Sequence, residues 1–134
     1  MKAGRELDAK VAEALGWQWG DTGQGLEGLF PPEGDLRYNI ALYGPLHFDK
    51  DGYLETMPRY STSWEGMGVL VEEAKKQGIR LEFSHGLNGG YYGGAYSFDD
   101  GEYQIDHSTN YAFTTAPHAV SLVFLMAKGV ISNA

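Results

Sequence analysis

The sequence contains no cysteine. Disulfide bonds and thiolate-bound metal ions are therefore excluded, and a reducing compartment is compatible with the chain. Long hydrophobic runs are also missing: the longest, from Leu122 to Ala127, is far shorter than the roughly 20 residues that span a bilayer. Charged residues interrupt the start of the chain, which is not typical of a secretion signal. We therefore expect a cytoplasmic protein that does not cross a membrane.

Basic residues are scarce. The chain has ten Lys and Arg residues and eighteen Asp and Glu residues, so its net charge is −8. A field of this sign repels the phosphate backbone of nucleic acids. The tyrosine-rich stretch from Tyr91 to Tyr111 contains no Lys or Arg, although proteins that stack single-stranded nucleic acid combine both kinds of residue. We expect no nucleic-acid binding, and the acidic balance fits either simple solubility or a face that meets a basic partner.

The spacing of apolar residues predicts a helix at each end of the chain. The first covers residues 3–15, because Leu7, Val11 and Leu15 recur on one helical face. The other begins near Thr115, and almost every residue after its first turn is apolar. A helix that is apolar on nearly all sides is buried on nearly all sides, so we expect the closing helix at the centre of the core.

A third helix is predicted in the middle of the chain, with Thr62 as its N-cap and Glu65 completing a capping box. Its apolar residues share one face, which we expect to be buried: Trp64, Met67, Leu70, Val71 and Ala74. Gly78 follows and predicts its end. Gly66 and Gly68 lie inside it, where each costs about 1 kcal/mol relative to Ala. Close packing against another backbone would compensate for this cost, and a binding groove is the alternative explanation.

Alternating apolar residues and turn signals predict about five strand segments. The segments lie at residues 36–43, 46–48, 53–57, 79–85, and in a hairpin of 95–98 with 102–107. Glycine-rich loops are expected at residues 17–35 and 86–94. We therefore predict one α+β domain over residues 1–134, a small sandwich in which an antiparallel sheet of about five strands packs with three helices and the C-terminal helix is buried.

Three separated segments resemble the phage ABA-sandwich domain, a family of small phage and prophage proteins of largely unassigned function. The segments are Met1 to Trp17, Met57 to Trp64, and Thr115 to Val130. The resemblance implies a sheet that lies between helices, and a phage or prophage origin. It supplies no catalytic residue. This chain departs from the family pattern in the early position of Trp64 and in the length of residues 20–56.

Histidine and acidic residues provide the only enzymatic hypothesis. His85 and His107 lie on predicted strands that could be neighbours, and with Asp106 or Asp99 they could form a metal site or an acid–base pair. This alternative describes a small metal- or nucleotide-dependent hydrolase, or a nucleotide-binding protein. The spacing of the histidines is not that of a helical metal site, however, and scattered histidines are usually structural.

Two other stretches resemble ligand loops without completing them. The glycine-rich residues 86–94 lack the Lys-Ser/Thr pair of a phosphate-binding loop. Residues 49–52 lack the remaining ligands of a calcium loop. The sequence therefore predicts no catalytic residue, no metal ligand and no cofactor, and it makes an enzyme the less favoured class.

The favoured hypothesis is a non-catalytic phage or prophage protein that binds a host protein in the host cytoplasm. Inhibition of a host defence system, such as a CRISPR nuclease, is the biological role that we expect. The predicted binding residues combine two aromatic anchors with acidic groups for a basic target. They are Tyr91, Tyr92, Asp99, Asp100 and Glu102. The loop from Trp19 to Phe30 is the alternative place for a partner, because it also combines exposed aromatic and acidic residues.

Overall fold

The computed structural model describes residues 1–99 and 102–134, and it has the predicted α+β class. In chain order the elements are α1 (Arg5–Ala14), β1 (Gln18–Asp21), β2 (Glu27–Phe30), the 3-10 turn η1 (Leu36–Tyr38), α2 (Ile40–Tyr43), α3 (Trp64–Lys76), β3 (Arg80–His85), β4 (Tyr91–Asp99), β5 (Glu102–Ser108) and α4 (Ala116–Ala127). The five described strands form two antiparallel sheets, β1–β2 and β3–β4–β5, instead of one.

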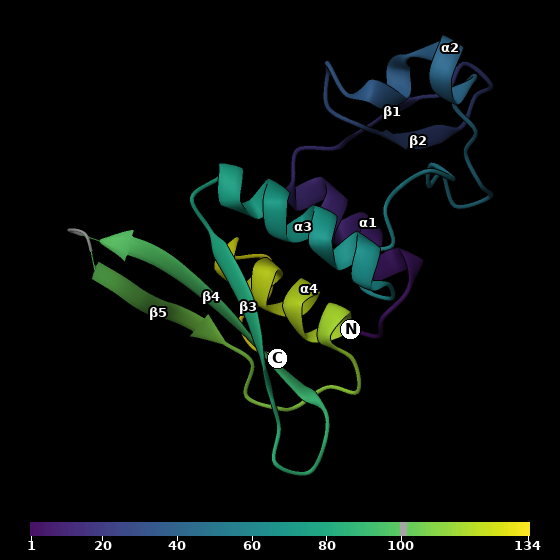
Figure 1. The fold of residues 1–134 in the computed structure, drawn as a ribbon. Helices are drawn as coiled ribbons and strands as arrows, with labels where there is room; N and C mark the ends of the chain where they lie inside the picture. Colours follow the sequence, from purple (N-terminus) through teal and green to yellow (C-terminus); the bar gives the residue numbers. More distant parts are fainter. Residues whose placement is uncertain (100–101) are drawn as a thin grey trace.

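Helix α4 lies at the centre of the fold. It packs against all three strands of the larger sheet, and α1 and α3 contact it as well (Figure 1). Ten of its residues are buried, which confirms the prediction of a buried closing helix. The helices lie on one face of the β3–β4–β5 sheet, whereas the family resemblance implies a sheet between helices.

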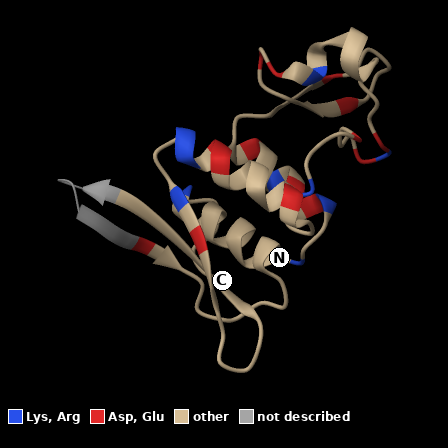
Figure 2. Ribbon diagram, in the orientation of Figure 1, with Lys and Arg blue, Asp and Glu red and all other residues tan. Residues whose placement is uncertain are grey.

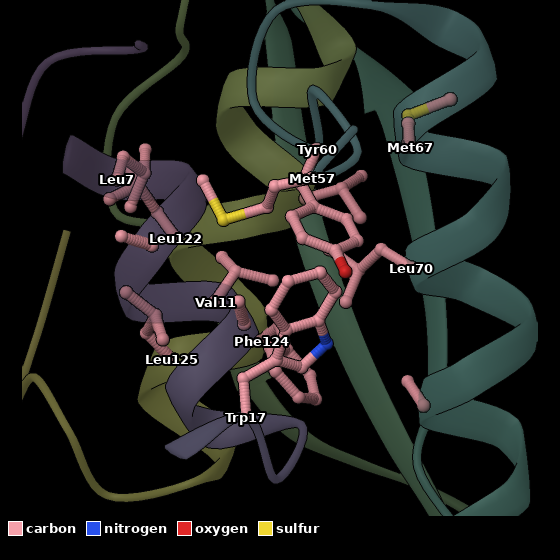
Figure 3. Packing of buried hydrophobic residues seen from close by; sticks show 14 of the residues in the cluster. Leu7, Val11, Trp17, Met57, Tyr60, Met67, Leu70, Leu122, Phe124 and Leu125 are labelled. Atoms are coloured by element: carbon pink, nitrogen blue, oxygen red, sulfur yellow. The ribbon is translucent and has the colours of Figure 1, made fainter. Parts of the chain in front are cut away.

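The core forms where α1, α3 and α4 meet. Leu7, Val11 and Leu70 contribute apolar side chains from two of these helices, together with Phe124 from α4 (Figure 3). Trp17 folds back onto this cluster as its sequence position predicts, and only 5% of it is exposed. Tyr60 is also in the cluster, where burial raises the pKa of its hydroxyl well above the ordinary value of 10.0.

A buried polar contact joins α1 to the segment before α3. The Asp8 carboxylate accepts hydrogen bonds from the Ser61 amide at 2.8 Å and from the Ser61 hydroxyl at 2.7 Å. Arg5 pairs with the other Asp8 oxygen at 3.1 Å and donates to the Leu54 carbonyl oxygen. Because a buried carboxylate needs such partners, this contact fixes the two segments together.

Gly66 confirms the packing explanation for glycine in α3. A Cβ there would lie 2.8 Å from the Tyr60 amide nitrogen and closer still to the Arg59 carbonyl group, so only glycine fits. Gly68 does not share this role, because no described atom lies within 4 Å of its Cβ position apart from its chain neighbours and the backbone of its own helix. The N-cap of α3 is Ser63, whose hydroxyl accepts from the Gly66 amide at 2.9 Å, and not Thr62 as predicted.

The strand predicted at residues 36–43 is wrong. Asp35 caps the 3-10 turn η1 and Asn39 caps α2, and these two caps direct the backbone into helical turns. The alternating apolar residues of this segment are exposed, so their alternation does not reflect a buried sheet face.

Two predictions for the preceding and following segments also need correction. Residues 17–35 form the β1–β2 hairpin and are not only loop. Gly28 belongs in β2 because a Cβ there would approach the Phe48 ring to 2.7 Å. The turn predicted around residues 49–52 is present, but the segments on its two sides do not form strands. They share a single antiparallel bridge between Phe48 and Leu54.

Candidate functional site

Two uncharged parts of the chain meet at one end of the larger sheet. Residues 83–98 and 107–127 contain no Asp, Glu, Lys or Arg. Tyr91 and Phe113 join them by exchanging backbone hydrogen bonds of 2.7 and 2.9 Å. Figure 2 shows this end, around the turn between β3 and β4, without charged residues. The net charge of −8 therefore resides elsewhere on the molecule.

An exposed group of rings lies at this end, and we call it the aromatic cluster (Trp64, Phe83, His85 and Tyr91). Trp64 stacks edge-on against Phe83 and Tyr91, with ring centroids 5.4 and 6.3 Å apart. Tyr91 in turn lies 5.7 Å from Phe83 and 5.1 Å from His85. Such edge-to-face distances are those of stabilising aromatic contacts.

The cluster is held by three elements. Trp64 is the first residue of α3, directly after the Ser63 cap. Phe83 and His85 alternate along β3 on the face that also carries Leu81. Leu81 packs against the core, whereas Phe83 and His85 are exposed, so the helices do not cover this end of the sheet face.

Trp64 is the residue that the sequence interpretation placed wrongly. Its spacing from Met67 and Leu70 predicts burial, but 56% of it is exposed. The apolar stripe of α3 thus extends past the core and ends on the rings of Phe83 and Tyr91. The signal that points to this surface is the absence of charge over residues 83–98 and 107–127.

Tyr91 and Tyr92 lie on β4 and not on a mobile loop as predicted. One of the glycines that suggested a loop serves helix packing: a Cβ at Gly93 would lie 2.5 Å from the Ala119 carbonyl oxygen of α4. Successive strand residues point to opposite faces. Tyr91 is half-buried in the aromatic cluster, and Tyr92 is exposed on the opposite face of the sheet, so the two do not share one surface.

The acidic residues of the predicted site are at the other end of the same hairpin. Asp99 pairs with Glu102 across β4 and β5, and Asp100 lies outside the described residues. Eight residues separate Tyr91 from Asp99 along β4, which corresponds to roughly 26 Å of extended strand. The backbone therefore separates the tyrosines from the acidic residues, and a binding role for these five residues stays a prediction.

The structure does not make His85 and His107 neighbours. Strand β4 lies between their strands, and His107 is opposite Ala95, which is opposite Leu81. His85 is four residues farther along β3, so the two backbones are roughly 16 Å apart. Over residues 1–99 and 102–134 no group of three or more His, Asp or Glu side chains is placed to hold a metal ion.

Helix length and similarity to known proteins are two further observations on this chain. None of the helices within the described residues has the length and hydrophobicity needed to cross a lipid bilayer. Comparison with family models, with curated proteins and with solved structures gives no match for this chain. The resemblance to the phage ABA-sandwich domain stays a prediction.

Proposed function

We propose that this protein is a non-catalytic binding protein and that the aromatic cluster contacts a partner protein. The observation that carries the proposal is the exposure of Trp64 beside Phe83 and Tyr91, which belong to an uncharged stretch of an acidic chain. Exposed apolar groups gathered in one place are typical of interaction sites. Trp and Tyr are also the residues that most often dominate the binding energy of protein interfaces.

The accessible surface is consistent with an uncovered interface. It measures 8077 Å². A compact monomer of 14.7 kDa is expected to expose roughly 6,900 Å². The excess of about 1,200 Å² belongs to the whole surface of the chain, and it is larger than the roughly 800 Å² that one partner contributes to a standard interface.

The resemblance to phage proteins supports a host protein as the partner. We propose that binding takes place in the host cytoplasm and interferes with a host defence system, such as a CRISPR nuclease. Binding through rings requires no catalytic residue, metal or cofactor from this chain. It also requires no contact with nucleic acid, which a net charge of −8 would oppose.

Affinity capture with a matched pair of variants tests the proposal. The wild-type protein, Trp64→Ala and Val130→Ala are used as baits with host lysates, and the affinity of any captured protein is then measured. Val130 is 49% exposed and follows α4 near the C-terminal end of α3, whereas Trp64 begins α3, so it controls for the loss of an exposed apolar side chain away from the cluster. We expect Trp64→Ala to weaken binding at least thirtyfold, equivalent to about 2 kcal/mol, and Val130→Ala to change it less than twofold.

Urea unfolding of both variants accompanies this measurement. Because more than half of Trp64 is exposed, about 110 Å² of it is buried, and its replacement should lower the free energy of unfolding by only about 2 kcal/mol. A partner that binds Trp64→Ala as tightly as wild type would refute the role of the aromatic cluster. Loss of binding that accompanies global unfolding of Trp64→Ala would be re-examined with Phe83→Leu, which keeps apolar volume and removes the ring.

A further inference from the structure

A second surface lies on the part of the chain that precedes α3, which we call the small lobe (residues 18–56). It contains β1, β2, η1 and α2, and Figure 1 shows it on the opposite side of the helices from the β3–β4–β5 sheet. Its short helix α2 buries none of its residues: Ile40 is 70% exposed and Leu42 is 71% exposed. Large apolar side chains are rarely left so open in one place unless they meet another molecule.

A groove of about 570 Å³ opens beside these residues. This volume falls within the range of sites that bind small ligands or peptide side chains, about 300–1,000 Å³. Apolar side chains from both sides of the lobe line it: Leu26, Phe30, Ile40, Leu46 and Phe48. The rings of Phe30 and Phe48 contact each other at 4.9 Å between centroids and help to fix its shape.

The small lobe also concentrates the negative charge. Residues 18–56 include seven acidic and two basic residues, a net charge of −5 out of −8 for the chain. Glu27, Asp49 and Asp51 line the groove. Of the two basic residues that line it, Arg37 is held by both oxygens of the Asp35 carboxylate at 2.9 and 3.0 Å, so its charge is largely neutralised.

We propose that the small lobe binds a basic amphipathic segment of a partner protein, with apolar side chains in the groove and Lys or Arg toward Glu27, Asp49 and Asp51. The pairing of an apolar groove with acidic margins matches the two kinds of side chain in such a segment. Negative charge of this density opposes nucleic acids and anionic lipid surfaces. It also opposes a second copy of the chain, since two lobes of charge −5 would repel each other.

The groove is framed by hydrogen bonds that do not depend on its exposed apolar residues. The Leu29 amide donates to the Gly52 carbonyl oxygen at 2.8 Å, and the Asp49 carboxylate accepts from the Tyr53 amide at 3.0 Å. The Tyr38 hydroxyl donates to the Pro31 carbonyl oxygen at 2.7 Å. Substitution of the exposed residues Leu26 and Ile40 should therefore leave the lobe folded.

Three synthetic peptides test the proposal with the full chain. The first consists of leucine and lysine arranged so that a helix carries all leucines on one face. The second has the same composition in scrambled order, and the third replaces lysine by glutamate. Fluorescence anisotropy at low and high salt measures binding to wild type and to four variants. Two are double variants, Leu26→Ser/Ile40→Ser and Glu27→Gln/Asp51→Asn. Two are single variants, Leu36→Ser and Glu33→Gln.

Leu36 and Glu33 are matched controls, because both are exposed on the small lobe but do not line the groove. We expect the leucine–lysine peptide to bind wild type at least tenfold more tightly than the scrambled and glutamate peptides. The Leu26/Ile40 double variant should lose at least tenfold in affinity, and the Glu27/Asp51 double variant should also show a weaker dependence on salt. Each control should change affinity less than twofold.

Three results would overturn the proposal. In the first, the Leu26/Ile40 variant binds the leucine–lysine peptide as tightly as the Leu36 control does. Another is a dimer in sedimentation that the Leu26/Ile40 substitutions abolish, which would make a second copy the occupant. The third is groove-dependent sedimentation with anionic phospholipid vesicles. None of these results bears on the aromatic cluster, because Trp64 is unchanged in every variant.

Discussion

Gly66 and Gly68 offer a direct test of how α3 packs. Each is replaced by alanine in a separate variant. Both glycines lie inside α3, so in both cases alanine should favour the helix by about 1 kcal/mol through backbone entropy. The added methyl group has open space at Gly68, with no described atom within 4 Å apart from its chain neighbours and the backbone of its own helix. At Gly66 it would overlap the backbone of Arg59 and Tyr60.

The two substitutions should therefore change stability in opposite directions. The overlap at Gly66 involves backbone atoms, and the Arg59 carbonyl oxygen also accepts the Ser63 amide at 3.1 Å, so this segment resists movement. Overpacking of this kind costs about 3 kcal/mol, which leaves a net loss of about 2 kcal/mol for Gly66→Ala. Gly68→Ala should gain about 1 kcal/mol.

Urea and thermal unfolding followed by circular dichroism measure both variants. For a chain of this size about 1 kcal/mol shifts the melting temperature by roughly 4 °C, so we expect about +4 °C for Gly68→Ala and about −8 °C for Gly66→Ala. A Gly66→Ala protein as stable as wild type would show that the segment before α3 does not press on the helix. Destabilisation by Gly68→Ala would show that this position is covered.

Three further predictions concern buried polar groups. Ser61→Ala removes the hydroxyl that donates to the buried Asp8 carboxylate and accepts from the Gly4 amide, while the backbone amide of residue 61 still donates to Asp8, and it should lower the free energy of unfolding in urea by about 2 kcal/mol. The exposed neighbour Thr62→Ala should change it by less than about 0.5 kcal/mol. Ser121→Ala deletes a buried hydroxyl that has no hydrogen-bond partner among the described residues, so stability should rise by about 1 kcal/mol, and a loss would reveal a partner. Burial raises the pKa of Tyr60 in the folded state, so the folded protein holds the hydroxyl proton more strongly than the unfolded chain does. The protonated Tyr60 hydroxyl therefore contributes fully to stability below pH 10.0, and this contribution declines as the pH rises above that value. Tyr60→Phe should reduce the loss of stability at alkaline pH, measured by urea unfolding at several pH values.

The parts of the fold that the sequence predicts well are those with strong local signals. Helix α4 is apolar on almost every side, and Thr115 and Pro117 mark its start, so both its position and its burial follow from composition. The β4–β5 pairing follows from the turn sequence Asp-Gly between two short segments with strand-like alternation. In each case neighbouring residues contain the information.

The errors arise where distant residues determine the local structure. Gly28 and Gly93 look like loop residues, yet both lie in strands, and each is glycine because the Phe48 ring or the α4 backbone leaves no room for a side chain. No local pattern reports such contacts. Trp64 likewise fits the helical periodicity of the apolar residues in α3. Periodicity does not show how far the neighbouring elements cover the helix, so the sequence does not reveal that Trp64 is exposed.

The central place of α4 has a consequence for folding during synthesis. The ribosome makes α1, α3 and the β3–β4–β5 sheet before it makes α4, so their apolar faces have no covering layer until residues 116–127 emerge. Most contacts of α4 are with residues far away in the chain, which slows their formation relative to local contacts. The nascent chain thus lacks this core until α4 has been made, and until then it exposes the apolar surface that chaperones and proteases recognise.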